Sequence, residues 1–471
     1  MDEGDPRFLA LTEHGVARPL VDAVRRFVRE APDHELGRIN VLDFAERHGF
    51  DEDLVIEAFI VASRIGLVDM AWNVLCPGCG GVLGSNGSLR TIDRPAYNCA
   101  LCAARYEVTL DELVEINFSV SPAIRRIAAH DPDTLPIWQY CRQMFFSPSL
   151  VMPNGVELDT MFERLSLGHA EIRSGEHATV AFDAPEQFLV VFEPVTHAAV
   201  FVDVKGASSP SVQELSIVHT PAGPAPSVLA DVRPGPVRLR ITNATDHRIL
   251  PAVFLADDEF HHLLTKRPYL TAKRLICSQK FRDLYRAESI GVDQRLKIAN
   301  LTMLFTDLKG STELYERIGD LAAYDLVRSH FAVLAVVVRE HGGGVVKTIG
   351  DAVMATFPSP QQGMRAALAM RAGIDRLNED TGEDDLVVKI GLHQGGCLAV
   401  VSNERLAYFG QTVNIAARVQ ALAEGRAIHA TGPVVMNPEV VSLLAGLHLT
   451  PVERRVTLKG IRDEVVVYEI P

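Results

Sequence analysis

The sequence is short of basic residues for its size. Its 471 residues include 46 Lys and Arg against 60 Asp and Glu, which gives a formal net charge of −14. This deficit argues against a broad nucleic-acid-binding surface, although a local basic patch stays compatible with it. Hydrophobic residues make up 47% and charged residues 23% of the chain, a composition typical of globular proteins. The length indicates about three domains.

Long apolar segments are also missing. The longest uncharged apolar run, Phe331–Val338, is far shorter than the roughly 18–20 residues that a membrane helix needs. The acidic start, MDEGDPRF, has no apolar signal segment. We therefore expect a cytoplasmic protein that binds no membrane.

Two pairs of cysteines have the spacing of a zinc ribbon. Nineteen residues separate Cys76-Pro-Gly-Cys79 from Cys99-Ala-Leu-Cys102, and two such pairs can give one tetrahedral zinc ion four thiolates. A disulfide or redox role is the alternative, but it suits an oxidising compartment, which the missing signal segment argues against. We expect one structural Zn²⁺. The other three cysteines, Cys141, Cys277 and Cys397, are expected to be buried apolar residues.

The hydrophobic pattern predicts a multidomain α+β protein. Helical spacing dominates the first part of the chain, and a period of two begins near residue 145. The predicted regions are a helical winged-helix-like head (1–70), a zinc ribbon (71–117), a helical connector with an antiparallel β-sandwich (118–262), an amphipathic linker (263–298) and a catalytic domain (299–471).

The winged-helix-like head raises the question of DNA binding. A DNA-reading helix carries basic and amide side chains. The helix predicted at Asp51–Ile65 instead begins with Asp51, Glu52 and Asp53. We therefore expect no DNA binding.

The roles of two other regions are less sharply defined by the sequence. For the β-sandwich, we favour a structural or interaction role over ligand sensing. For the linker, a packing role and a signalling role are equally open. An unidentified regulatory ligand or protein is a further expected partner.

The C-terminal region places two carboxylates at the turns of neighbouring strands. An apolar strand from Leu301 ends on Asp307, and a second acid, Asp351, follows the strand Val345–Ile349. The predicted order is βαββαβ, the ferredoxin-like plan, with one helix running from near Thr312 to His341. Carboxylates of this kind can hold Mg²⁺ together with phosphate oxygens, although each alone would usually be a turn or cap residue. The amides at Gly310, Ser311 and Thr312, where that helix starts, could cradle a triphosphate.

Five stretches in this region together match one family. They are Phe305-Thr-Asp-Leu-Lys-Gly-Ser-Thr312, Val346-Lys-Thr-Ile-Gly-Asp-Ala-Val353, Ile390-Gly-Leu-His-Gln-Gly395, Phe409-Gly-Gln-Thr-Val-Asn-Ile-Ala-Ala-Arg418 and Leu458-Lys-Gly460. Residues 299–471 resemble the class III nucleotidyl cyclase catalytic domain over its whole length. The zinc ribbon and β-rich region look similar to those of bacterial proteins that carry this cyclase at their C-terminus.

The resemblance implies a reaction and a site shared by two chains. The reaction would convert ATP to 3′,5′-cyclic AMP and diphosphate at a head-to-tail homodimer interface, with two Mg²⁺ or Mn²⁺ ions per site. By resemblance, one chain supplies Asp307 and Asp351 for the metals and Lys389 for phosphates. The partner chain supplies the rest: Lys347 for the purine, Asn414 for the ribose, Arg418 for the α-phosphate and Lys459 for the terminal phosphates.

Two positions depart from the family pattern. Lys389 stands where the family more often has Arg, and Ala407 replaces the polar residue that contacts the base. By resemblance, Lys347 favours ATP over GTP. Because alanine offers no hydrogen bond to the base, we expect the selectivity among bases to be reduced. The alternatives are a cyclase of GTP or a pyrimidine nucleotide, an inactive nucleotide-binding scaffold, and a zinc-containing transcription regulator. The Gly-Gly-acid-acid-Phe signature of diguanylate cyclases is absent.

Overall fold

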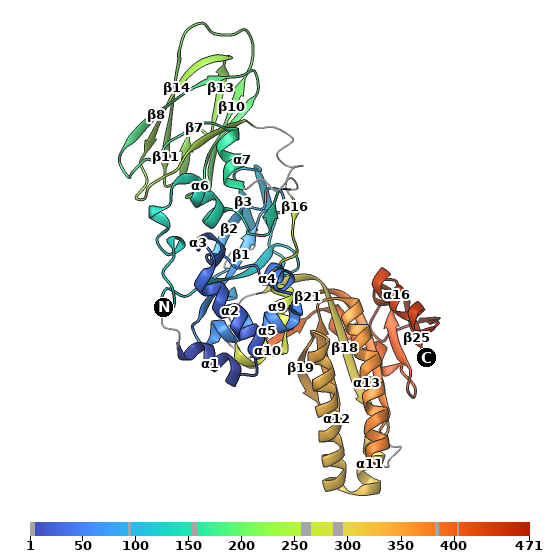
Figure 1. Cartoon of the computed structure of the whole chain (residues 1–471). Coiled ribbons are helices and arrows are strands. Elements are labelled where there is room, and N and C mark those ends of the chain that lie inside the picture. Colours follow the sequence, from blue (N-terminus) through green and yellow to red (C-terminus); the bar gives the residue numbers. More distant parts are fainter. Residues whose placement is uncertain are drawn as a thin grey trace. The chain divides into compact units, whose positions relative to one another are not determined.

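The chain folds into two compact units (Figure 1). The computed structural model describes residues 5–92, 96–152, 158–255, 265–285, 295–381, 386–402 and 405–471. The N-terminal unit comprises Met1–Gly87, Arg94–Val108 and Glu115–Leu270, and the C-terminal unit comprises Ser88–Asp93, Thr109–Val114 and Thr271–Pro471. The predicted division into five regions stays a prediction.

The N-terminal unit begins with helices, as the apolar spacing predicts. They are α1 (Pro6–Glu13), α2 (Arg18–Glu30), α3 (Asp33–Leu36), α4 (Val41–His48) and α5 (Glu52–Arg64). Asp51 is the N-cap of α5, because its side chain accepts a hydrogen bond from the Leu54 amide at 3.1 Å. Strands β1 (Val68–Leu75), β2 (Val82–Asn86) and β5 (Val114–Val120) follow, with β1 between the other two; β17 (Leu270–Thr271) pairs with β5.

Short elements connect this part of the chain to the β-rich part. They are β3 (Ala96–Cys99), β4 (Ala104–Glu107), η2 (Ala128–His130), η3 (Pro132–Thr134), α6 (Ile137–Tyr140), the π-helical turn η4 (Cys141–Phe145), β6 (Leu150–Val151), α7 (Leu158–Leu165) and β16 (Thr265–Lys266). Phe145, Phe146 and Phe162 lie in one buried cluster with Phe192 of the neighbouring sheet. The connector is therefore packed and not a free linker.

Two packed sheets form the β-rich part. One has the order β13-β10-β9-β15-β7 and the other β12-β11-β14-β8. Their bounds are β7 (Ser166–His169), β8 (His177–Ala184), β9 (Phe188–Glu193), β10 (Ala198–Val204), β11 (Gln213–Thr220), β12 (Gly223–Ala225), β13 (Val228–Val232), β14 (Gly235–Asn243) and β15 (Ala252–Leu255). Apolar side chains from both sheets share one core, among them Val191, Val200, Ile217 and Leu239.

The prediction of an antiparallel sandwich was wrong in one respect. Strand β10 runs parallel to β13, and β11 runs parallel to β14, so both sheets are mixed. The chain crosses from one sheet to the other after β7, β8, β10, β12, β13 and β14. A strand that returns to a sheet after such crossings can lie parallel to its neighbour, whereas alternating hydrophobicity carries no information on strand direction.

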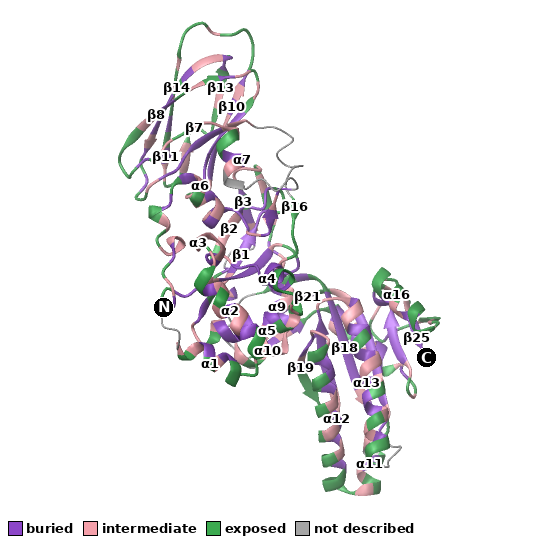
Figure 2. Cartoon of the chain, in the orientation of Figure 1, coloured by how far each residue is buried: buried purple, intermediate pink, exposed green. Residues whose placement is uncertain are grey.

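The C-terminal unit contains the predicted βαββαβ order. Its elements are α9 (Ala272–Cys277), α10 (Gln279–Leu284), β18 (Leu296–Leu308), α11 (Ser311–Ile318), α12 (Asp320–Glu340), β19 (Gly344–Ile349), β20 (Ala352–Phe357), α13 (Pro360–Thr381), β21 (Val388–Ser402), β22 (Arg405–Phe409), α14 (Gln411–Ala421), β23 (Ile428–Thr431), α15 (Gly432–Val435), α16 (Pro438–Gly446), β24 (Val452–Val456) and β25 (Val465–Ile470), with η1 (Leu89–Thr91). The sheet order is β19-β20-β18-β21-β23-β25-β24, with β22 on β21. Its strands are largely buried, and the outer faces of α12 and α13 are exposed (Figure 2).

The single helix predicted from Thr312 to His341 is two helices. Gly319 lies between α11 and α12 with φ of 80°, a conformation that interrupts a right-handed helix and suits glycine. Helix α12 is long and apolar enough, by length and composition, to cross a membrane. Its Ala323, Val327 and Leu334 are buried in the core, whereas Leu321 and Val336 are exposed, so core packing accounts for only part of its apolar surface.

Three segments outside residues 299–471 also belong to the C-terminal unit, namely 88–93, 109–114 and 271–298. In the described part of the predicted linker, Leu275 and Phe281 are buried, which favours the packing role; residues 286–294 lie outside the described residues. Asp111, from the predicted zinc-ribbon region, accepts hydrogen bonds from the amides of Ala299 and Asn300 and pairs with Lys273 at 3.1 Å. This acid therefore fixes the start of the central strand β18.

Candidate active site and a cysteine cluster

Asp307 and Asp351 lie at one end of the C-terminal sheet. Asp307 is the penultimate residue of β18, and Asp351 follows Gly350 in the turn between β19 and β20. The Leu308 amide donates a hydrogen bond to Asp351 Oδ2 at 3.2 Å. The buried Thr306 hydroxyl accepts one from the Val353 amide at 3.1 Å. These bonds hold the turn against the end of β18 and bring the two carboxylates together, as the sequence predicts.

The surroundings of Asp307 raise the pKa of its carboxyl group above the ordinary value. Burial raises its pKa, and the neighbouring Asp351 raises the pKa further. Lys389, which faces Asp307 across the β18–β21 pair, and Gln420 of α14 oppose that rise. A divalent cation beside both carboxylates would relieve their repulsion, so this pair of residues could hold a metal.

The predicted phosphate loop starts α11. Gly310 has φ of 69° and is the N-cap residue, and Ser311 is the first helical residue. The first amides of a helix lack partners within the helix and can face an anion. Thr312 lies in this turn, but its side chain lies outside the described residues.

A glycine in β21 lets the main chain of α14 pack directly against the main chain of that strand. A Cβ atom on Gly391 would stand 2.2 Å from the Gln420 amide nitrogen, closer than any side chain permits. At the other end of the helix, Thr412 Oγ1 donates to the Gly396 carbonyl at 2.6 Å. The buried face of α14 is Thr412, Ala416, Val419 and Gln420.

The other predicted residues lie on the exposed side of these elements. Asn414 is exposed on α14, and a Cβ atom on Gly460 would lie 3.6 Å from both terminal nitrogens of Arg418. Arg418 therefore lies beside the turn that carries Lys459. Lys347 is exposed on β19, and Ala407 is half-buried on β22 opposite Val400.

The predicted residues thus form two groups. Among the described residues, no hydrogen bond or ion pair joins Asp307 or Asp351 to Asn414 or Arg418. The first group could bind cations, and the second could bind anions. The sequence interpretation missed Gln420. A polar residue on the apolar stripe formed by Ala416 and Val419 was the signal that could have found it.

The four paired cysteines come together in the N-terminal unit. Their sulfur atoms all lie within 4.8 Å of one another, with Cys76 to Cys102 at 3.6 Å and Cys79 to Cys99 at 3.7 Å. A tetrahedron with Zn–S bonds of about 2.3 Å has sulfur–sulfur edges of about 3.8 Å. The cluster therefore fits a four-thiolate zinc site. As predicted, Cys141, Cys277 and Cys397 are buried.

Two protein families match this chain. Residues 1–283 match a family of unknown function (DUF5939), and residues 294–470 match the adenylate and guanylate cyclase catalytic domain. The chain belongs to the first family and carries a class III nucleotidyl cyclase catalytic domain. The match covers the strands and helices that hold Asp307, Asp351, Asn414 and Arg418.

Relatives of this cyclase domain include adenylate cyclases. The chain is 28% identical over 185 residues to an adenylate cyclase of Anabaena cylindrica, covering 36% of each protein. It is 34% identical over 131 residues to adenylate cyclase 2 of Rhizobium meliloti, covering 25% of this chain and 36% of that protein. The chain thus spans about a third of the length of these curated relatives. The crystal structure of the adenylyl cyclase CyaB from P. aeruginosa aligns with 23% identity and a TM-score of 0.33, over 38% of this chain and 96% of that one.

Proposed function

We propose that the protein is an adenylate cyclase that converts ATP to 3′,5′-cyclic AMP and diphosphate. The observation that carries the proposal is the pairing of Asp307 and Asp351 at adjacent strand ends, within a domain that matches the cyclase family. The test is product formation from ATP, GTP, CTP and UTP with Mg²⁺ or Mn²⁺. A clean preference for GTP or a pyrimidine nucleotide would contradict the choice of ATP.

Asp307 and Asp351 would hold two Mg²⁺ or Mn²⁺ ions. The fit rests on the closeness of the two carboxylates, and the raised pKa of Asp307, due to burial and then to Asp351, is consistent with it. Bound cations would acidify the ribose 3′-hydroxyl and offset charge on the departing diphosphate. Lys389 would contact phosphate oxygens, and the amides at Gly310, Ser311 and Thr312 would orient the phosphates.

The second group of residues would act from a partner chain in a homodimer. Arg418 would stabilise charge developing at the α-phosphate, Asn414 would orient the ribose, and Lys459 would bind the terminal phosphates. The proposal is supported by the exposure of Asn414 and Lys459. Because phosphoryl chemistry depends on positioning and electrostatic stabilisation, the assembled cations would supply most of the rate.

Mixing two inactive variants tests this shared site. Asp307→Asn and Arg418→Ala chains should each be inactive alone, since each spoils both sites of its own homodimer. A mixed dimer has one intact site, so random mixing should restore about a quarter of native activity. No recovery after subunit exchange, demonstrated by size and labelling, would show that each chain uses its own residues.

Selection of the base would rest on Lys347, which would contact the purine edge. Ala407 provides no hydrogen bond there, which supports reduced selectivity among nucleotides. The Ala407→Asp variant should sharpen the preference between ATP and GTP at least several-fold. An unchanged ratio of kcat/KM values would place base selection elsewhere.

The N-terminal unit would hold one structural Zn²⁺ on Cys76, Cys79, Cys99 and Cys102. The sulfur spacing supports this assignment. Four thiolates leave no open position, so the zinc would shape the fold and take no part in the cyclase reaction. The helices and strands before the cluster would form a winged-helix-like head that binds no DNA, which the acids at the start of α5 support. We also propose a cytoplasmic location without membrane binding.

A further inference from the structure

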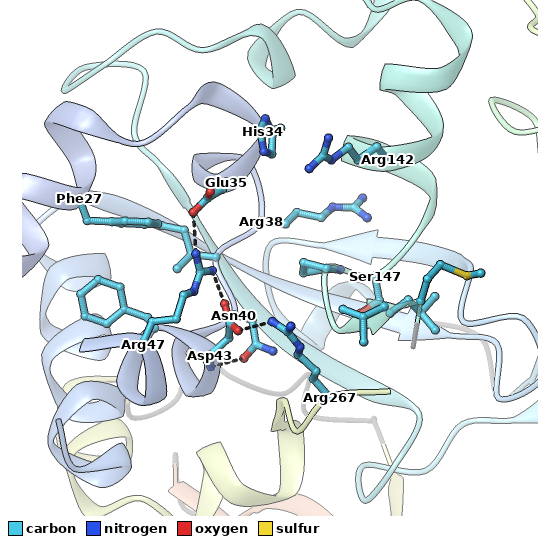
Figure 3. Close-up of a pocket in the computed structure, with 16 residues that line it drawn as sticks. Phe27, His34, Glu35, Arg38, Asn40, Asp43, Arg47, Arg142, Ser147 and Arg267 are labelled. Carbon is cyan, nitrogen blue, oxygen red and sulfur yellow. Dashed lines mark hydrogen bonds and ion pairs between the residues drawn. The ribbon is translucent and has the colours of Figure 1, made fainter. Parts of the chain in front are cut away.

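A cavity in the N-terminal unit has the dimensions of a small-molecule site. Its volume is about 360 Å³, and it lies where α2, α3 and α4 meet the chain around η4 and β6 (Figure 3). Sites for small ligands usually enclose about 300–1,000 Å³ and combine apolar walls with a few polar groups. Phe27, Phe44 and Leu150 supply apolar wall here.

The charged residues that line this cavity are mainly basic. Four arginines line it, namely Arg38, Arg47, Arg142 and Arg267. The acids in the lining are Glu35 and Asp43, so the formal charge is four minus two, or +2 with histidine neutral. The whole chain carries −14. The lining of the cavity is therefore positively charged, whereas the protein as a whole is negatively charged. A positive lining favours an anion inside the cavity.

Both acids are already engaged by two of the arginines. Arg47 contacts Glu35 at 2.9 Å and also pairs with Asp43, and Arg267 pairs with Asp43 at 2.7 Å. Figure 3 shows these pairs as dashed lines, and none of them reaches Arg38. Arg38 thus lies outside these ion pairs.

Arg38 differs from Arg47 and Arg267 in its partners. Its Nη1 donates to the Phe146 carbonyl at 3.3 Å, and in the described parts of the chain no carboxylate lies within ion-pair distance of it. Burial lowers its pKa to about 10, with Glu115 acting in the opposite direction. Burial raises the pKa of Glu115, whose Oε1 accepts hydrogen bonds from the hydroxyls of Ser147 and Ser149 at 2.8 and 2.7 Å.

We propose that this cavity binds a small organic oxyanion, with a carboxylate or phosphate on Arg38 and an apolar body against Phe27, Phe44 and Leu150. A guanidinium presents two parallel N–H donors, a geometry that matches both oxyanions. This site is separate in sequence from the cyclase residues, and the proposal does not depend on the reaction they catalyse.

Calorimetric titration of the full chain, without nucleotide, tests the proposal. The probes are phenyl phosphate and benzoate, with phenol as the neutral control of matched size. At least one oxyanion should bind saturably at millimolar concentration or below, and phenol should bind at least tenfold more weakly. The two oxyanions distinguish a phosphate-bearing from a carboxylate-bearing ligand. If neither binds saturably up to about 10 mM, which corresponds to no more than about 3 kcal/mol, the proposal is wrong.

Variants assign the binding to Arg38. Arg38→Gln should weaken the binding at least tenfold, and Arg38→Lys, which keeps the charge but loses the paired donors, should give an intermediate loss. Arg126→Gln is the matched control, since Arg126 is exposed and pairs with Asp131 on the surface. Equal binding by Arg38→Gln and the native chain would overturn the assignment. The same titration on the Asp307→Asn chain should give the native result, so failure of the cyclase proposal would leave this one intact.

Discussion

The carboxylate of Asp351 accepts a hydrogen bond from the main-chain amide of Leu308 at 3.2 Å. Leu308 follows Asp307 directly, so this bond fixes the turn that carries one acid against the strand end that carries the other. Two carboxylates held together in this way repel each other, which contributes to the raised pKa of Asp307. The fold therefore assembles a site with unbalanced negative charge before any cation arrives.

Removing one of these acids should abolish the cyclase reaction. We expect Asp307→Asn, which keeps the shape of the side chain but removes its charge, to lower kcat by about 100-fold or more. The measurement is cyclic AMP formation by the full chain. Asp380→Asn, at an exposed position near the end of α13, is the control and should keep native activity. Native activity in Asp307→Asn would show that the metal site is misassigned.

Because α14 contacts β21 closely, we predict that one methyl group added at Gly391 destabilises the fold. A Cβ atom on Gly391 would meet the Gln420 amide nitrogen at 2.2 Å and its Cα at 2.4 Å, so Gly391→Ala must push the helix outward. Overpacking of this kind typically costs about 1–3 kcal/mol. Since α14 also carries Asn414 and Arg418, activity should fall together with the unfolding temperature. Gly446→Ala is the matched control, because nothing lies within 4 Å of a Cβ atom there.

Zinc removal should affect the N-terminal unit and spare the catalytic chemistry. Native protein should contain one zinc per chain by elemental analysis, and Cys76→Ser should lose it, because one of the four thiolates is gone. Cys141→Ala removes a buried thiol from the same unit and should keep the zinc. The full-length Cys76→Ser chain should retain metal-dependent cyclase activity, because the cysteine cluster lies in the other unit from Asp307 and Asp351. Full zinc content in Cys76→Ser would contradict the assignment.

We predict that the buried His393 makes the protein less stable to unfolding in mild acid. Burial lowers its pKa to about 4, and its Nδ1 lies 2.7 Å from the Thr431 hydroxyl. The unfolded chain, with an ordinary histidine pKa near 6.5, binds the proton that the folded chain refuses. Stability is therefore fully present above about pH 6.5 and is lost as pH falls toward 4.

A pair of substitutions isolates this effect. Between pH 7.0 and pH 5.0, urea unfolding of the native chain should lose about 1–2 kcal/mol more than that of His393→Gln. The exposed His448 lies in the same unit, and asparagine tolerates its positive φ, so His448→Asn should keep the native pH dependence. Parallel pH profiles for the native chain and His393→Gln would show that another group controls the acid response.

Local patterns in the sequence determined several parts of the structure. The alternation and helical spacing of apolar residues fixed most strands and helices, and Asp51 capped its helix where its position predicted. The spacing within each cysteine pair predicted a short turn that keeps its two thiols close, and the fold then brought the two pairs together. Asp307 and Asp351 were correctly placed at turns because strand ends are marked by nearby residues, among them Gly310 and Gly350.

The tertiary structure alone decided which distant segments meet. It placed Lys389 opposite Asp307, Gln420 beside Asp307, and Asp111 at the start of β18. It also set the parallel strand pairs of the sandwich and gathered Arg38, Arg142 and Arg267 around one cavity. Spacing along the chain encodes periodicity and turns, but contacts between residues far apart in sequence depend on topology and packing. An overall deficit of positive charge therefore gave no indication of where the fold would concentrate the cations it has.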